Sequence, residues 1–188
     1  MVATMSPDAI DSRLLALSGV DGSQRERRDD ARGWESVAHR AEPQAPPGTR
    51  VQTIVVRSQR GVLRGTYAHP STAAHVSLVD GEALLALHDA RPASATYGRS
   101  VTVELGANAT LSAVRLPAGV AYALWFVTDA VHALSSSRAI DPVDEYACRW
   151  DDPGLGFQWQ PVNPVLSTRD ALAGSLNALR TSVAAALG

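Results

Sequence analysis

Hydrophobic and polar residues alternate in short segments through the middle of the chain, from about residue 48 onwards. A period of two is typical of strands that bury one face, and turn-forming residues separate the segments. Eight segments show this pattern: VQTIVV (51–56), GVLRGTYA (61–68), HVSLV (75–79), EALLALH (82–88), SVTVEL (100–105), TLSAVRL (110–116), VAYALWFV (120–127) and HALSS (132–136). No segment of helical period and length interrupts them, which argues against a βαβ fold. We therefore expect an all-β protein, an eight-stranded jelly roll with an open mouth for a ligand.

The amino-terminal part of the chain has a different pattern. Residues 6–17 predict a short helix, because Ser6 can cap it and Pro7 suits its first turn. The following segment, DGSQRERRDDARG (21–33), holds four arginines and four acidic residues. Such a segment predicts a solvated loop or an arm that a partner orders.

The carboxyl-terminal part predicts an amphipathic helix that Ser167 or Thr168 would cap. Its apolar stripe consists of Leu172, Leu176, Leu179 and Val183. The pattern as a whole indicates three parts: a short helix and charged arm over residues 1–45, a jelly-roll domain over 46–165, and a helix packed on the barrel over 166–188.

Composition narrows the classes of protein that fit this pattern. The 188 residues suit about one domain, and a net charge of −2 does not favour nucleic-acid binding. All 17 basic residues are arginine, so no lysine is available to form a Schiff base. Cys148 is the only cysteine, and no apolar run approaches the length of a membrane span. We expect a cytoplasmic, soluble protein without a signal peptide or membrane association.

Three sequence motifs indicate a family. They are RGVLRG (60–65), GEALLALHDARPASATYG (81–98) and RWDDPGLGFQW (149–159), which PVLSTRD follows. Together they resemble the dTDP-4-dehydrorhamnose 3,5-epimerases, a family of cupin-like jelly-roll enzymes. The resemblance implies a homodimer that acts without metal or cofactor on a small-molecule substrate, a nucleotide-linked 4-keto sugar. In the family, a histidine oriented by an aspartate removes a proton beside the ketone, a lysine stabilises the enolate, and a tyrosine returns a proton.

The residues expected to transfer protons differ from the family pattern. Tyr67 stands at the position of the histidine base, and a tyrosine is a poor base at neutral pH unless a nearby cation lowers its pKa. Ala74 stands at the lysine position, and the tyrosine position falls on Leu134 or Ser135. Tyr122 replaces a supporting histidine.

Other positions match the family pattern. Arg32 corresponds to an arginine that contacts the nucleotide phosphates, Gln52 and Glu145 to polar positions near the substrate, and Asp170 to the aspartate that orients the base. Ile54 replaces an asparagine that binds the substrate. Each match has a simpler interpretation, since Asp170 also suits a helix start and Arg32 and Glu145 also suit a charged surface.

Strand alternation adds expectations about the candidate site. Arg64 lies between apolar neighbours in a central strand and needs an anion or a polar partner, and Tyr67 should share a face with Gly65. His69 lies two positions further along that face. The candidate catalytic residues are Tyr67, Arg64, Asp170 and Tyr122, and the candidate substrate-binding residues are Arg32, Gln52, His69 and Glu145.

The histidines do not predict a metal site. Metal-binding cupins use a pair of histidines two residues apart and a later histidine, whereas YAH supplies His69 alone and Tyr122 occupies the later position. His75 and His132 lie on other predicted strands. We therefore expect no metal.

Three functions fit the sequence. The first is an isomerase or cyclase that acts on a natural-product intermediate, with Tyr67, Tyr122 and Arg64 as hydrogen-bond donors. The second is a 3- or 3,5-epimerase of dTDP-4-keto-6-deoxysugars, in which His69 takes the role of the base. The third is a protein without catalytic activity that binds a ligand or a partner.

Overall fold

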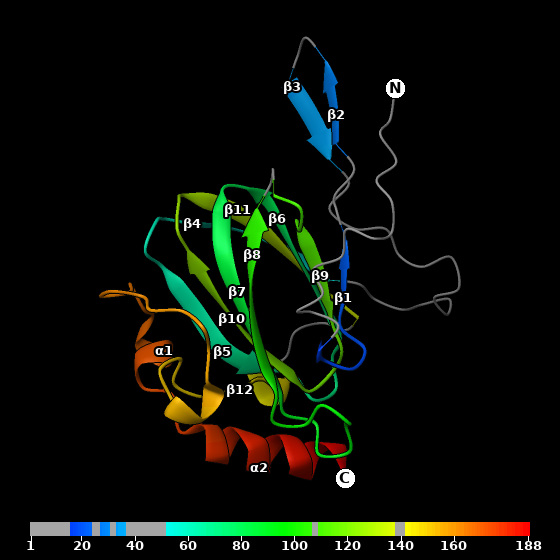
Figure 1. Cartoon of the computed structure of the whole chain (residues 1–188), viewed down its shortest axis with the longest axis vertical. Helices are drawn as coiled ribbons and strands as arrows, with labels where there is room; N and C mark the ends of the chain where they lie inside the picture. Colours follow the sequence, from blue (N-terminus) through cyan, green and yellow to red (C-terminus); the bar gives the residue numbers. More distant parts are fainter. Residues whose placement is uncertain (1–15, 24–26, 31–32, 37–51, 107–108, 138–141) are drawn as a thin grey trace.

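The computed structural model describes residues 16–23, 27–30, 33–36, 52–106, 109–137 and 142–188. Two five-stranded antiparallel sheets face each other, and a helix lies across one end of the strands (Figure 1). The first sheet contains, in spatial order, β1 (Asp21–Ser23), β9 (Ala113–Leu116), β6 (Ala74–Asp80), β11 (Ala130–Ser136) and β4 (Gln52–Ser58). The second contains β12 (Tyr146–Ala147), β5 (Leu63–Ala68), β10 (Val120–Phe126), β7 (Glu82–Asp89) and β8 (Ser100–Gly106). The eight predicted strands correspond to β4 through β11, so the all-β jelly roll is confirmed.

The inward faces of the two sheets meet in one apolar core. Leu85 and Leu87 of β7 have no accessible surface, and neither does Phe126 of β10. These residues recur at every second position of their strands, as the alternation predicts. Burial of each such side chain contributes about 1.5–3 kcal/mol to folding. The core therefore fixes which face of every strand points into the sandwich.

Strand β5 departs from simple alternation. Tyr67 is paired with Tyr122 and Arg64 with Leu124, and the register shifts between these pairs. One extra residue in β5 therefore places Arg64 and Tyr67 on the same, inward face, while Gly65 lies opposite Ala123. The prediction that Tyr67 shares a face with Gly65 is wrong, because alternation cannot anticipate a bulge.

A glycine is required at this bulge. Gly65 has a φ of +117°, and a Cβ atom there would lie 2.6 Å from the carbonyl oxygen of Tyr122. A side chain would meet the backbone of β10, which cannot move aside without breaking the strand pairing. The close approach of β5 to β10 therefore depends on this glycine.

The predicted carboxyl-terminal helix consists of two helices. α1 (Thr168–Ala171) begins after Ser167, whose side chain accepts a hydrogen bond from the amide of Asp170, and α2 (Leu176–Leu187) begins after Ser175. Leu176, Leu179 and Val183 pack against the ends of β5 and β10, as the stripe predicts. Leu172 does not, since it lies between the helices and is 79% exposed. Ser175 caps a new helix, which the stripe did not reveal.

Two short 3₁₀ helices, Pro142–Asp144 and Pro153–Leu155, precede this region. None of the helices in the described part of the chain has the length and apolarity that crossing a membrane requires.

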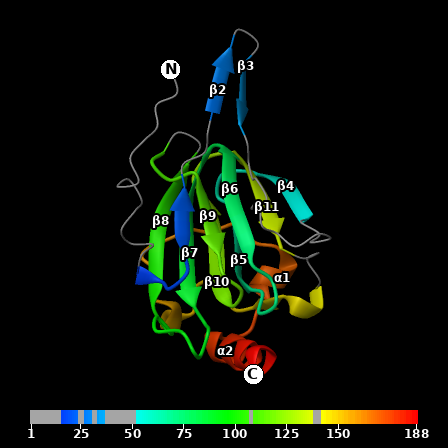
Figure 2. The ribbon, with the colours of Figure 1, turned by 90° about the vertical axis from the view of Figure 1, so that its right-hand side faces the viewer.

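The amino-terminal region contributes strands that the sequence did not predict. The segment 21–33 contains β1, which pairs with β9, and β2 (Arg27–Asp30), which pairs with β3 (Gly33–Ser36). Figure 2 shows the β2–β3 hairpin standing beyond the end of the sandwich. Strand pairing uses backbone groups, which a charged composition does not prevent. Most of the predicted helix over 6–17 lies outside the described residues.

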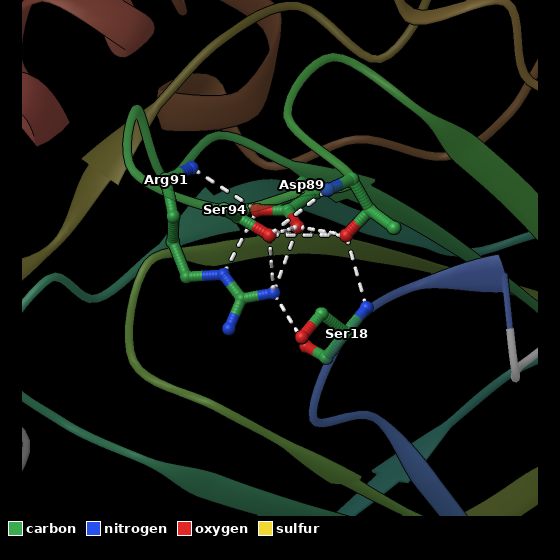
Figure 3. Close-up of polar contacts among 5 residues, drawn as sticks. Ser18, Asp89, Arg91 and Ser94 are labelled. Atoms are coloured by element: carbon green, nitrogen blue, oxygen red, sulfur yellow. Dashed lines mark hydrogen bonds and ion pairs between the residues drawn. The ribbon is translucent and has the colours of Figure 1, made fainter.

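Hydrogen bonds centred on the buried carboxylate of Asp89 connect the start of the described chain to the sandwich (Figure 3). Asp89, at the end of β7, has no accessible surface. It accepts hydrogen bonds from Nε and Nη2 of Arg91 at 2.8 and 2.7 Å, and from the hydroxyls of Ser94 and Thr96 at 2.6 and 2.5 Å. Arg91 and Thr96 in turn bind the backbone of Ser18. Asp89 therefore links the end of β7, through Arg91 and Thr96, to Ser18.

Candidate active site

Tyr67 and Asp170 form the central contact of the site. The Tyr67 hydroxyl donates a 2.5 Å hydrogen bond to Oδ1 of Asp170, which joins β5 to α1. Burial, and then the hydrogen bond and charge of Asp170, raise the pKa of Tyr67 well above its usual value. At neutral pH Tyr67 is therefore a neutral phenol, which suits a proton donor and not a base.

Asp170 serves the helix start and the site at once. Its amide donates to Oγ of Ser167 at 3.1 Å, and Ser167 donates to Oδ2 of Asp170 at 2.8 Å. This reciprocal pair is an N-terminal cap, the simpler interpretation of Asp170. The other carboxylate oxygen is used by Tyr67, so the capping interaction also fixes the orientation of Asp170 toward β5.

A second group with an acidic partner lies just beyond the end of β5. His69 is 5% exposed, and its Nε2 lies 3.4 Å from Oε2 of Glu145. Arg169 forms an ion pair with the other oxygen of Glu145, and its guanidinium lies 5.0 Å from the centre of the Tyr67 ring. Burial lowers the pKa of His69, while the charges of Glu145 and Asp144 oppose this shift. His69 and Tyr67 therefore belong to one connected cluster.

Tyr122 lies beside both groups. It is 5% exposed, and its ring centre is 6.0 Å from that of Tyr67 and 6.3 Å from that of His69. Burial raises the pKa of Tyr122, so it is a neutral phenol like Tyr67. The structure thus brings together five of the candidate residues: Tyr67, Asp170, Tyr122, His69 and Glu145.

Arg64 lies on the same face of β5, toward the opposite end of the strand. Its Nε donates to the hydroxyl of Ser58 at 3.0 Å. His132 on β11 is 5% exposed and its ring lies 5.1 Å from that of Phe126. Burial, and then the charge of Arg64, lower the pKa of His132 to about 4. In the sequence His132 is considered only as a possible metal ligand, because a single histidine on a predicted strand does not indicate contact with Arg64.

The other residues considered from the sequence are not among those that the structure brings together. Arg32 lies outside the described residues. Gln52 is half-buried on β4, opposite Ser136 of β11. Of the two positions considered for the family tyrosine, Leu134 packs against the core and Ser135 shares a 2.8 Å hydrogen bond with Thr53.

Arg169 is the residue of the cluster that sequence reasoning missed. Its neighbour Asp170 was selected from the same motif, but no pattern in the sequence indicated that Arg169 would reach Glu145. Within the described part of the chain, no three His, Cys, Asp or Glu side chains are arranged to hold a metal ion.

Comparison with known proteins places the chain among sugar epimerases. A family model described as dTDP-4-dehydrorhamnose 3,5-epimerase matches residues 15–178. The chain belongs to this family. A dTDP-4-dehydrorhamnose 3-epimerase from Streptomyces niveus is 32% identical over 166 residues, which make up 84% of this chain and 80% of the relative.

Solved structures of epimerases share the fold. ChmJ, a 3'-monoepimerase from Streptomyces bikiniensis in complex with dTDP-quinovose, has a TM-score of 0.76 at 30% identity, with 89% of each chain covered. NovW, a 4-keto-6-deoxy sugar epimerase from the novobiocin biosynthetic gene cluster of Streptomyces spheroides, has a TM-score of 0.75 at 28% identity, covering 88% of this chain and 87% of NovW. The family resemblance inferred from the motifs is confirmed.

Proposed function

We propose that this epimerase-family chain inverts a carbon beside the ketone of a dTDP-4-keto-6-deoxysugar, and that this carbon is C3. The relative from Streptomyces niveus is a 3-epimerase, ChmJ is a 3'-monoepimerase, and NovW acts on a 4-keto-6-deoxy sugar. These neighbours favour the second function considered from the sequence over an isomerase or cyclase of another natural-product intermediate.

The observation that carries the proposal is the pairing of Tyr67 with Asp170 on the inward face of β5. Inversion requires removal of a proton from the carbon and delivery of another to its opposite face. Tyr67 is a half-buried phenol of raised pKa, and it supplies the delivered proton. Asp170 orients the hydroxyl.

The enolate formed between these steps requires positive charge or hydrogen-bond donors. The chain has no lysine, so arginine is the side chain that carries a positive charge throughout the reaction. Arg64 shares the inward face with Tyr67, and among the described residues no carboxylate forms an ion pair with it. A guanidinium without such a partner favours a substrate role over the third function, in which Arg64 would be held in a structural ion pair.

The test is incubation with dTDP-4-keto-6-deoxyglucose in D₂O. We expect deuterium at C3, detected by mass spectrometry and located by NMR, together with the C3 epimer. Replacement of Tyr67 by phenylalanine should lower formation of the epimer by about 10²–10⁴-fold, while deuterium exchange at C3 continues with retention of configuration.

The matched control is Tyr97→Phe, because Tyr97 is 46% exposed and contacts Arg180 only through its ring. It should epimerise at the wild-type rate. No deuterium in the sugar after hours at high concentrations of wild-type protein would refute the proposal. The homodimer implied by the resemblance remains a prediction, and sedimentation at micromolar concentration tests it.

A further inference from the structure

The reaction proposed above requires a base, and the residue at the expected position is unsuited to that role. Tyr67 donates its only hydroxyl proton to Asp170, and its raised pKa keeps the phenol protonated. A base that works at neutral pH needs a lone pair that is free at that pH. The group must therefore come from another residue that faces the same space.

We propose that His69, supported by Glu145, is the catalytic base of this site, and that Arg169 positions Glu145 and balances its charge. This inference depends on the proposed epimerase function, because it names the residue that removes the substrate proton. It differs from the arrangement that the family resemblance implies, in which the base lies two residues earlier, at position 67, with Asp170 behind it.

The burial and contacts of His69 support this role. The side chain is 5% exposed, and neither ring nitrogen makes a hydrogen bond of good geometry among the described residues, although the backbone of Asp144 lies near enough to raise the pKa of His69. Leaving a buried polar atom unpaired destabilises the folded state. Nε2 lies 3.4 Å from Oε2 of Glu145, so Glu145 favours the tautomer with the proton on Nε2 and the lone pair on Nδ1. The ring also lies beside Tyr122, whose inward position is set by the pairing of β10 with β5.

The charges around His69 suit a base. Burial lowers its pKa and Arg169 acts in the same direction, while Glu145 and Asp144 raise it. Neutral imidazole therefore prevails at pH 7, with a free lone pair. Once His69 has taken a proton, the Glu145 carboxylate stabilises the imidazolium, as the carboxylate of a histidine-carboxylate pair does.

Arg169 links the two halves of the cluster. It lies next to Asp170 on α1, contacts the face of the Tyr67 ring, and forms an ion pair with Glu145. The side chain is 51% exposed, so its attraction for Glu145 is screened by solvent. Arg169 touches no reacting atom in this scheme, and it is a positioning residue.

Different residues remove and deliver the proton. The Nδ1 lone pair of His69 takes the proton from C3, the C–H electron pair forms a C=C bond, and the carbonyl π electrons move onto the oxygen as an enolate. When the enolate collapses, C3 takes the proton of the Tyr67 hydroxyl. Inversion requires His69 and Tyr67 to act on opposite faces of the sugar ring. The phenolate then regains a proton from solvent, and the imidazolium releases one.

The closing experiment compares deuterium exchange at C3 by wild-type protein and by His69→Asn and His69→Gln. Both variants should lose exchange by about 10²-fold or more while retaining wild-type affinity for dTDP, which also reports that they fold. His75→Asn, on β6 of the opposite sheet, is the control and should exchange normally. Tyr67→Phe should exchange without inversion, which separates the base from the donor.

The pH dependence of exchange tests the roles of Glu145 and Arg169. Glu145→Gln removes a charge that raises the pKa of His69, so the acidic limb of the rate profile should move to lower pH. Arg169→Gln removes a charge that lowers this pKa, so the limb should move to higher pH. A purely structural role would not produce shifts of opposite sign.

The outcomes are distinguishable. If wild-type protein exchanges and both His69 variants exchange within about 3-fold of it, His69 is not the base and the epimerase function stands. If both variants lose dTDP binding, the rate–pH profile of Glu145→Gln tests the assignment instead. An acidic limb that does not move in this variant overturns the assignment. If wild-type protein does not exchange, the proposed function fails and the assignment fails with it.

Discussion

Replacement of Asp89 by asparagine should destabilise the protein and loosen its amino-terminal attachment. The Asp89 carboxylate is inaccessible and accepts two hydrogen bonds from the guanidinium of Arg91, which lies two residues later. Asparagine has nearly the same shape but no charge, and its NH₂ group would face donors. The substitution therefore removes the ion pair and leaves Arg91 without its partner.

The magnitude follows from the pKa of Asp89. Burial would raise this pKa, but hydrogen bonds from Arg91, Ser94 and Thr96 outweigh it and hold the value at about 2, below the usual 3.8. This difference corresponds to about 2 kcal/mol of stability, and breaking a buried pair by removing one partner costs up to about 5 kcal/mol. Because the folded-state pKa is lowered, this contribution is complete at pH 7 and is lost as the pH falls from about 4 through 2.

The assay is urea denaturation at pH 7 with Asp151→Asn as the matched control. Asp151 binds Arg149 through the same two guanidinium nitrogens and at the same spacing in sequence, but on the surface. We expect a loss of about 2–5 kcal/mol for Asp89→Asn and an unchanged midpoint for Asp151→Asn. Hydrogen exchange should also accelerate at the amide of Ser18, which donates a hydrogen bond to the hydroxyl of Thr96. Equal effects of the two substitutions would refute the reasoning.

Two further predictions concern backbone packing and pH. Gly65→Ala should lower the free energy of unfolding, measured by urea denaturation, by several kcal/mol, because its Cβ would lie 2.6 Å from a β10 carbonyl oxygen. Gly61→Ala is the control and should lower it by only about 1 kcal/mol, because a Cβ there meets nothing within 4 Å. Similar losses in the two variants would contradict the proposed clash. His88 is inaccessible, and burial and then the charge of Arg180 lower its pKa from 6.5 to about 4. The contribution of neutral His88 to the free energy of unfolding should therefore be fully present above about pH 6.5 and fall by about 3 kcal/mol toward pH 4. If the free energy of unfolding of a His88→Gln variant depends on pH as steeply as that of the wild-type protein, this assignment is refuted.

Local sequence patterns predict most of the strands of the fold. Strands β4 to β11 were recognisable because each buries one face, and that requirement appears in the sequence as alternation. The same reasoning misjudged β5, where the extra residue next to Gly65 reverses the face on which Tyr67 lies. It also missed the break between α1 and α2, because the apolar stripe continues through Leu172 although that side chain is exposed.

The candidate site was predictable only in part. The resemblance implies that Asp170 orients the residue at position 67, and the structure places Tyr67 and Asp170 in contact. His69 and Glu145 were selected without any reason to pair them, and Arg169, which joins both pairs, was not selected at all. Short motifs report which residue types are present, whereas contacts depend on how distant strands and helices pack.

The sequence by itself determined the class of fold, the absence of lysine chemistry and the substitution of tyrosine at position 67. The tertiary structure decided what Tyr67 can do. Its hydroxyl meets a carboxylate 103 residues away in sequence, in a buried setting that raises the pKa of the phenol. Burial and long-range contacts set proton affinities, and neither is encoded in the residues next to Tyr67 along the chain.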